Sequence, residues 1–288
     1  MFNITKEERG VVGLAAKVVA IAAVTLVSVV AHAGIANTKH NLGTSGNTNE
    51  NYMSAGTGAG EICVFCHTPH ASNTNVKAPL WNKPLPGSSY TTYSTATSST
   101  IDGSVDMQGV SLACLSCHDG SQAMDTMINK PGSGGYAAAG ATLTGRTWAG
   151  ARQTGGKMQN ATEFISMLGT DLSNDHPVGI QYCGGGVSTG SASTADASAG
   201  TCKDADFVAP SNDLIGGARA WWVDTGGGGR QKTDMILYAR TGTTTDSTNG
   251  WYQPWVECAS CHDPHTENAT FLRKANTASA VCLACHTK

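Results

Sequence analysis

The sequence has few large apolar side chains for its length. Aromatic residues make up 6% of its 288 positions and charged residues 14%, whereas glycine alone occupies 35. With so few large apolar side chains, burial contributes too little free energy to offset the conformational entropy that is lost on folding. This composition argues against a domain built around a large side-chain core, so another source of buried apolar surface is needed.

An excess of basic residues is also missing. Residues 34–288 contain 15 Lys and Arg against 19 Asp and Glu, which gives a net charge of −4. Proteins that bind nucleic acids usually present clustered positive charge to the phosphates. We therefore expect no nucleic-acid partner.

Long apolar runs are absent after the first 33 residues. Residues 18–30 are apolar, basic residues precede them, and Ala31-His32-Ala33 is a small-x-small sequence. The alternative is a membrane anchor, but a bilayer-spanning helix needs about 20 apolar residues. We predict that residues 1–33 are a signal peptide that is removed. The mature domain, 34–288, is then exported and has no transmembrane span.

What the sequence does contain is one pentapeptide, Cys-x-x-Cys-His, written four times, at 63–67, 114–118, 258–262 and 282–286. In c-type haem attachment the two sulfurs form thioethers to the porphyrin and the histidine binds the iron. Zinc sites instead use four ligands that converge tetrahedrally, and here a histidine follows each cysteine pair at once. We predict four covalently attached c-type haems, held by Cys63, Cys66, Cys114, Cys117, Cys258, Cys261, Cys282 and Cys285.

The histidine count fits two ligands for each iron. Four histidines belong to the pentapeptides and His32 leaves with the signal peptide, so four remain in the mature chain. Four distal ligands for four irons leave no coordination position open. The predicted iron ligands are the proximal His67, His118, His262 and His286 and the distal His40, His70, His176 and His265.

Two of the distal candidates follow a pentapeptide closely. His70 and His265 each lie three residues after a proximal histidine, in the sequences CHTPH and CHDPH. They cannot easily reach the opposite face of their own porphyrin, so an adjacent haem is favoured. We assign His70 to the second haem and His265 to the fourth. His40 and His176 then serve the first and third haems, in an order that the sequence does not fix.

Two cysteines remain outside the pentapeptides. Cys183 and Cys202 flank a Gly/Ser/Thr/Ala-rich stretch. In an exported protein such a pair forms a disulfide that limits the freedom of the loop; two free thiols are the alternative.

The expected fold is mostly irregular, with short helices and a small β-hairpin, wrapped around four covalently bound haems. Aromatic and branched residues at 218–224 and 234–240 flank the glycines at 226–229, which predicts the hairpin. Gly/Ser/Thr-rich insertions are expected near 88–104, 131–156 and 184–201. The short interval between the last two pentapeptides predicts that the third and fourth haems are neighbours.

Several segments resemble a known family. They are His40-Asn41-Leu42, the two CHxPH sequences, 79–82, 174–179 and 271–273. Together they are similar to the OmcE-like tetrahaem cytochromes of metal-reducing bacteria, which polymerise into extracellular nanowires. The resemblance covers about half of the mature chain and none of the insertions. It implies bis-histidine ligation of every haem and one distal histidine supplied by the neighbouring subunit. His40, on a polar N-terminal arm, is our choice for that ligand.

These observations predict an electron carrier rather than an enzyme, because irons with two histidine ligands have no site for a substrate. The expected protein is a cell-surface or extracellular filament subunit. It takes electrons from upstream periplasmic cytochromes and passes them to extracellular acceptors. The alternatives are a monomeric periplasmic shuttle, in which His40 folds back onto its own subunit, and a multihaem reductase.

Overall fold

The computed structural model describes residues 34–46, 50–94, 98–159, 164–188, 201–215, 218–240 and 253–288. The predicted signal peptide and residues 189–200 of the third insertion lie outside these ranges. The chain divides into two units, Met1–Gly34 and Ile35–Lys288, and nearly all described residues belong to the second. Among the described residues, no helix is both long and apolar enough to cross a bilayer.

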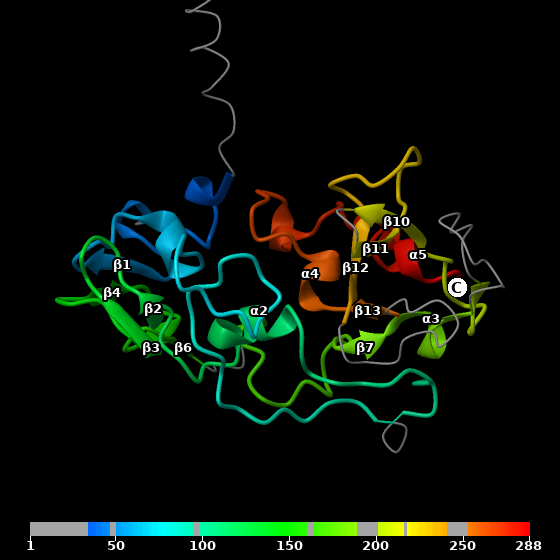
Figure 1. Ribbon diagram of the computed structural model, residues 1–288, viewed down its shortest axis with the longest axis horizontal. Helices are drawn as coiled ribbons and strands as arrows, with labels where there is room; N and C mark the ends of the chain where they lie inside the picture. The colour runs from blue at the N-terminus through cyan, green and yellow to red at the C-terminus, as the bar shows by residue number, and fades with distance from the viewer. Residues whose placement is uncertain are drawn as a thin grey trace, which may run out of the picture. The chain divides into compact units, whose positions relative to one another are not determined.

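Short elements joined by irregular backbone make up the second unit (Figure 1). The helices are η1 Gly34–Asn37, η2 Thr44–Gly46, η3 Ile62–Phe65, α2 Ser111–His118, α3 Tyr182–Gly185, α4 Cys258–Cys261, η4 Ala269–Phe271, η5 Thr277–Ser279 and α5 Cys282–Cys285. The strands are β1 Tyr52–Ala55, β2 Met127–Asn129, β3 Tyr136–Ala141, β4 Thr147–Ala149, β5 Gln153–Thr154, β6 Lys157–Met158, β7 Ile180–Gln181, β8 Val187–Ser188, β9 Thr201–Cys202, β10 Ser211–Ile215, β11 Ala218–Val223, β12 Met235–Ala239 and β13 Pro254–Val256. The expectation of a mostly irregular chain with short helices is confirmed.

The predicted hairpin is formed by β11 and β12. Trp221 pairs with Leu237 and Trp222 with Ile236 in antiparallel register. The Asp224 carboxylate accepts a hydrogen bond from the amide of Gly226 at 2.9 Å, which helps to order the glycine turn. The hairpin is the centre of a larger sheet than we expected, of order β10-β11-β12-β13-β7. The sequence could not show β7 and β13 joining, because their pairing brings together distant segments.

The two largest apolar clusters pack directly against cysteines of the pentapeptides. Trp221, Met235 and Leu237 belong to one of them, with Cys261 and Cys285 packed at its edge. The other contains Met53, Phe65, Met124, Met127 and Leu143, with Cys66 and Cys117 at its edge. The protein core therefore adjoins the proposed cofactor sites at both ends of the sequence.

The insertion at 131–156 contains paired strands rather than a featureless loop. β3 pairs with β2, and β4 pairs with β1. Buried Asp125 holds this region by accepting hydrogen bonds from Arg146 at 2.6 Å, from the Trp148 indole at 3.2 Å and from the amide of Leu143 at 3.0 Å. The glycine- and alanine-rich sequence hides these strands, since it lacks the alternation of polar and apolar residues that predicts them.

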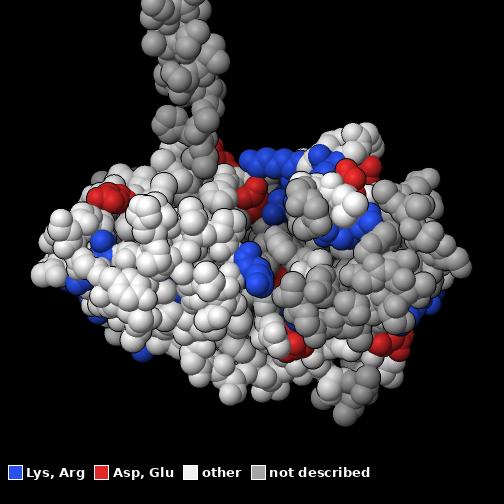
Figure 2. Space-filling view, viewed as in Figure 1, with Lys and Arg blue, Asp and Glu red and all other residues white. Residues whose placement is uncertain are grey.

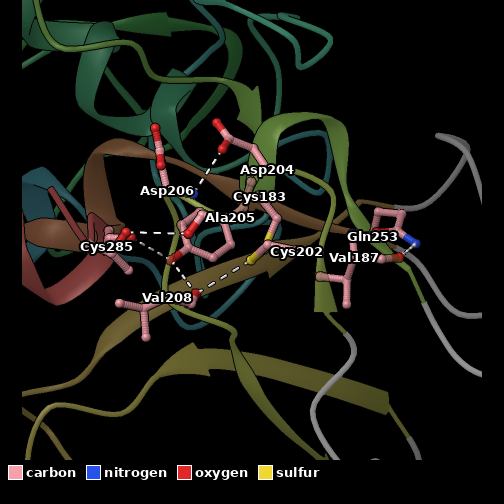
Figure 3. The surroundings of a disulfide bond; sticks show 11 residues. Cys183, Val187, Cys202, Asp204, Ala205, Asp206, Val208, Gln253 and Cys285 are labelled. Carbon is pink, nitrogen blue, oxygen red and sulfur yellow. Dashed lines mark hydrogen bonds between the residues drawn. A yellow bond between two sulfur atoms is a disulfide. The ribbon is translucent and has the colours of Figure 1, made fainter.

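Cys183 and Cys202 form a disulfide, as the sequence predicted (Figure 3). The bond lies beside the fourth pentapeptide. The hydroxyl of Tyr182 donates to the carbonyl of Val208 at 2.8 Å, and the amide of Val208 donates to the carbonyl of Cys285 at 2.9 Å. The disulfide thus fastens the ends of the third insertion where it meets the C-terminal site.

Replacing both Cys183 and Cys202 by alanine is expected to destabilise the folded protein by about 3 kcal/mol, because the open loop regains entropy in the unfolded chain. Denaturant unfolding of the oxidised protein and the variant measures the difference. The wild-type protein under reducing conditions is the matched control and should resemble the variant. Equal stability of oxidised protein and variant would contradict this expectation.

Candidate functional site

Each pentapeptide occupies a single helical turn. The second forms the last turn of α2, the third and fourth begin with α4 and α5, and the first overlaps η3. In the first, third and fourth, the histidine amide donates to the carbonyl of the first cysteine at 2.9–3.1 Å. This i to i+4 bond places the cysteine and the histidine on one side of the turn. The backbone therefore presents two thiols and an imidazole together, as attachment of a haem requires.

Three of the proximal imidazoles are oriented by a carbonyl. The Nδ1 atom of His67 lies 2.7 Å from the carbonyl oxygen of Pro79. The corresponding distances are 2.6 Å from His118 to Ser166 and 2.8 Å from His262 to Thr270. A carbonyl only accepts, so Nδ1 carries the proton and Nε2 keeps its lone pair. Metal-binding histidines are oriented by the same kind of second hydrogen bond.

Three proximal histidines face a candidate distal histidine. The ring centroids lie 6.1 Å apart for His67 and His265, and 6.2 Å apart for His118 and His40. For His286 and His176 the separation is 6.4 Å. In each pair the partners come from segments that are distant in the sequence, so the tertiary fold creates the pairs.

These separations fit one metal ion between each pair of rings. A metal–imidazole bond is about 2.0–2.1 Å long and the ring centroid lies about 1 Å behind the nitrogen, so two trans ligands have centroids about 6 Å apart. In the described part of the chain, no three His, Cys, Asp or Glu side chains come close enough to hold a metal ion by themselves. Two imidazoles per site suit a metal whose other positions a planar macrocycle occupies. The residues present therefore fit a c-type haem.

The fourth proximal histidine, His262, is different. Among the described residues no second imidazole ring stacks on it or meets it edge-on, and both His262 and His70 are exposed. His70 is the one predicted distal ligand that faces no proximal histidine in this structure.

The ring pairs differ from our assignments for three haems. His40, not His70, faces the proximal histidine of the second haem, and His265 faces that of the first haem instead of the fourth. His176, which we assigned to the first or third haem, faces the proximal histidine of the fourth. His40 is also enclosed within its own chain, where its ring stacks on Phe271 at 4.2 Å. Sequence spacing indicated that a neighbouring haem would be served, but the direction of the CHDPH turn depends on distant hydrogen bonds such as that from the amide of Asp263 to the carbonyl of Phe271.

Burial favours the neutral form of two candidate distal imidazoles, His40 and His176, and of the proximal His118. Burial, together with the neighbouring His118, lowers the pKa of His40 to about 4. Burial also lowers the pKa of His118 and of His176. A neutral imidazole has the lone pair that binds a metal, so the environment favours the ligand form.

The cysteines of successive pentapeptides are neighbours. Cys66 lies within electrostatic range of Cys117, and Cys261 within that of Cys285. Between these two contacts, a hydrogen bond joins the thiols of Cys114 and Cys258, which raises the pKa of the former and lowers that of the latter. The four sites thus follow one another in space in the order of the sequence. The neighbouring third and fourth sites were predicted; the rest of the order was not.

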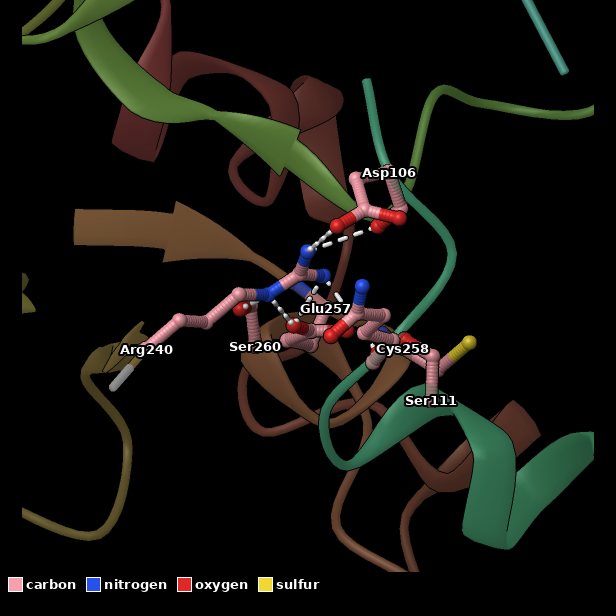
Figure 4. Close-up of polar contacts among 7 residues, drawn as sticks. Asp106, Ser111, Arg240, Glu257, Cys258 and Ser260 are labelled. Carbon is pink, nitrogen blue, oxygen red and sulfur yellow. Dashed lines mark hydrogen bonds and ion pairs between the residues drawn. The ribbon is translucent and has the colours of Figure 1, made fainter. Parts of the chain in front are cut away.

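A buried ion pair joins the second and third sites (Figure 4). Glu257, the N-cap residue of α4, accepts bonds from Arg240 Nε at 2.8 Å and from the hydroxyl of Ser111, the first residue of α2. The same hydroxyl accepts a bond from the amide of Cys258 at 3.1 Å. Arg240 also donates to the carbonyl of Asp106 at 2.6 Å. Sequence reasoning missed this network, because its members come from distant segments. The one available signal was the position of Glu257 directly before a pentapeptide.

Charges of both signs are interspersed over the described part of the surface in Figure 2. On the face drawn in Figure 2, basic and acidic side chains are scattered among uncharged ones. Several charges pair locally, such as Lys39 with Glu50 at 3.1 Å and Lys288 with Asp206 at 2.6 Å. The surface therefore agrees with the small net charge of the sequence.

One family model, described as a doubled CXXCH motif, matches residues 255–288. This segment contains the third and fourth pentapeptides, and the match extends to no other part of the chain. No curated protein matches the sequence. The pentapeptides indicate covalently bound c-type haem, and the doubled motif indicates a multihaem c-type cytochrome that carries electrons.

Proposed function

We propose that the chain is an electron-transfer cytochrome c with four haems, each with two histidine ligands. The single observation that carries the proposal is the set of three imidazole pairs at 6.1–6.4 Å, each containing one CxxCH histidine. When bound, haem would supply an iron that takes up and releases one electron. The residues of this chain would fix its position through two thioethers and close its axial positions with imidazoles.

Two imidazoles at each iron would favour a carrier over an enzyme. A haem reductase needs an open position on the iron, and a distal histidine would fill it. Two histidines also favour a lower reduction potential than the Met/His pair of other cytochromes c. Both properties suit a respiratory electron carrier, and the order of the four sites supports a continuous path along the chain.

The experiment is expression with the haem-attachment machinery of an exported cytochrome. The mature protein is expected to gain the mass of four haems, and its ferric iron should be low-spin by electron paramagnetic resonance, because nitrogen ligands fill both axial positions. A variant with Cys114 and Cys117 replaced by serine should lose the mass of one haem. A high-spin signal from a stoichiometric fraction of the iron in the native assembly would support the reductase instead.

The protein is further proposed to polymerise head-to-tail into an extracellular filament that conducts electrons out of the cell. His70 and His262 support this proposal, since both are exposed and His262 faces no imidazole of the described chain. We therefore give His70 the role of intersubunit ligand that we first expected for His40. A head-to-tail contact that does not close produces an open filament. The resemblance to OmcE-like cytochromes points the same way.

A monomeric periplasmic shuttle is the second candidate function. It is favoured by the position of His40, whose ring lies 6.2 Å from that of His118 in the same chain. In this case His70 would serve the iron at His262 of its own subunit. Upstream periplasmic cytochromes would supply the electrons in either case, and the acceptor would be extracellular for the filament.

A further inference from the structure

Lys83 is a basic residue that the chain buries almost completely. Its exposed fraction is 1%, whereas lysine is almost never fully buried unless its charge is paired. The ammonium group donates to three backbone carbonyls, those of Thr126 at 2.8 Å, Met124 at 2.9 Å and Ala123 at 3.4 Å. All three ammonium donors therefore have an acceptor.

No carboxylate neutralises this ammonium. In the described part of the chain, Lys83 takes part in no ion pair, and the nearby Asp125 carboxylate pairs with Arg146. The three carbonyl dipoles stabilise the ammonium but leave its net charge unchanged. The field of a dipole decreases faster with distance than that of a charge, so beyond its immediate shell Lys83 acts as one unit of positive charge.

The charge is held close to the first pentapeptide. The amide of Asn82, the preceding residue, donates to the carbonyl of Cys66 at 2.9 Å. The Asn82 side chain, itself fully buried, donates to the carbonyl of Val64 at 2.7 Å and to that of Asn129 at 2.9 Å. The backbone that carries Lys83 is therefore held beside the first pentapeptide by the hydrogen bonds of Asn82, and the three carbonyl acceptors fix the position of the ammonium group.

Little solvent separates Lys83 from this site. Met124, one of its carbonyl partners, belongs to the apolar cluster against which Cys66 and Cys117 pack. Charges in such an environment interact several times more strongly than in water, and dissolved salt screens them only weakly.

We propose that Lys83 is a tuning residue that raises the reduction potential of the haem bound by Cys63 and Cys66. This inference rests on the proposed function. Reduction adds one electron to the iron and no proton, so the haem gains one unit of negative charge. A fixed positive charge nearby stabilises that product. The electron comes from a neighbouring haem in the protein and from dithionite in the test. A raised potential at the first site makes one end of the haem series the preferred place for an electron.

The test compares Lys83→Gln with Lys77→Gln in the haem-loaded protein. Glutamine can still donate hydrogen bonds to the carbonyls but carries no charge. Lys77 lies in the same stretch of sequence but is exposed, so it is a matched control for the loss of one lysine. In a spectroelectrochemical titration, one component should account for about a quarter of the absorbance change. The equilibrium constant for reduction of that component should be ten times smaller in Lys83→Gln than in the wild type. A factor of ten corresponds to about 59 mV for one electron.

The shift should persist in 1 M salt, and Lys77→Gln should titrate like the wild type. A folded Lys83→Gln protein with unchanged midpoints overturns the inference, because a purely structural lysine would alter stability and not potential. Haem content and spin state are measured on the same samples. An unchanged midpoint with four low-spin haems therefore refutes the tuning role alone, while missing haems refute the proposed function.

If Lys83→Gln does not fold, the order of haem reduction in the wild-type protein tests the proposal instead. The haem methyl resonances of each site can be followed by NMR during stepwise reduction. The haem at Cys63 and Cys66 should be reduced before the haem at Cys258 and Cys261, beside which the buried charges of Arg240 and Glu257 cancel. The reverse order contradicts the proposal.

Discussion

Replacement of Arg240 by methionine is expected to destabilise the folded protein by about 3–5 kcal/mol, the usual cost of leaving one partner of a buried ion pair alone. Glu257 is 1% exposed, and Arg240 supplies its two guanidinium hydrogen bonds. Methionine keeps much of the side-chain volume, so the loss reports on the charge and the hydrogen bonds. Denaturant unfolding of the haem-loaded protein measures it.

The double variant Arg240→Met/Glu257→Gln is the matched control. Removing both charges leaves no isolated ion, so this variant should recover a large part of the stability. Lys232→Met is a second control, because Lys232 is exposed and its contact with Asp263 is long, at 3.9 Å. If Arg240→Met loses no more stability than Lys232→Met, the buried pair does not hold α2 and α4 together as we infer.

The loss should depend on pH. Burial raises the pKa of Glu257, and Arg240 opposes that rise, so the pKa increases further when Arg240 is removed. A folded state with the higher pKa binds the proton more tightly than the unfolded chain, and stability then falls as pH rises. The variant should be closest to the wild type below the ordinary glutamate pKa of about 4.3. The variant should lose stability as pH rises from there through the folded-state pKa of Glu257. The quantity to compare across pH is the difference in the free energy of unfolding between variant and wild type.

Replacement of His70 by alanine is expected to abolish filaments, whereas replacement of His40 should leave them intact. His70 is exposed, and the described hydrogen bonds of this residue use its backbone carbonyl, which accepts from Thr68 at 3.0 Å and Asn129 at 2.8 Å. Alanine preserves those bonds, so folding is unaffected. His40 faces His118 within one chain, and its loss should convert about a quarter of the iron to high-spin in filaments that still form.

Electron microscopy and electron paramagnetic resonance on the same preparations separate the two assemblies. Wild-type protein that stays monomeric at all concentrations, with every haem low-spin, establishes the shuttle and removes the filament. Filaments of His70→Ala that match the wild type exclude His70 as the intersubunit ligand. If the wild type is monomeric and wholly low-spin, high-spin iron in the His70→Ala variant places this ligand in its own subunit.

Much of the site was predictable because it is local. Two cysteines and a histidine within five residues fall on one helical turn whatever the rest of the chain does, and each pentapeptide does so here. The β11–β12 hairpin was predictable for the same reason, since Trp221 and Leu237 meet across a short glycine turn. The strands around 131–156 were missed because their partners β1 and β2 lie outside the insertion.

The sequence by itself determined which residues can hold a haem, that Cys183 and Cys202 are left to pair, and that distal histidines are available. Only the tertiary structure decided which imidazoles face each other, in what order the sites follow and which charges lie buried beside them. His40 and His265 show the reason. A ring pair such as His67 and His265 depends on the direction of two loops that many weak, distant contacts set together. The spacing of residues along the chain does not predict those contacts. The burial of Lys83 likewise follows from the tertiary structure and not from its position in the sequence.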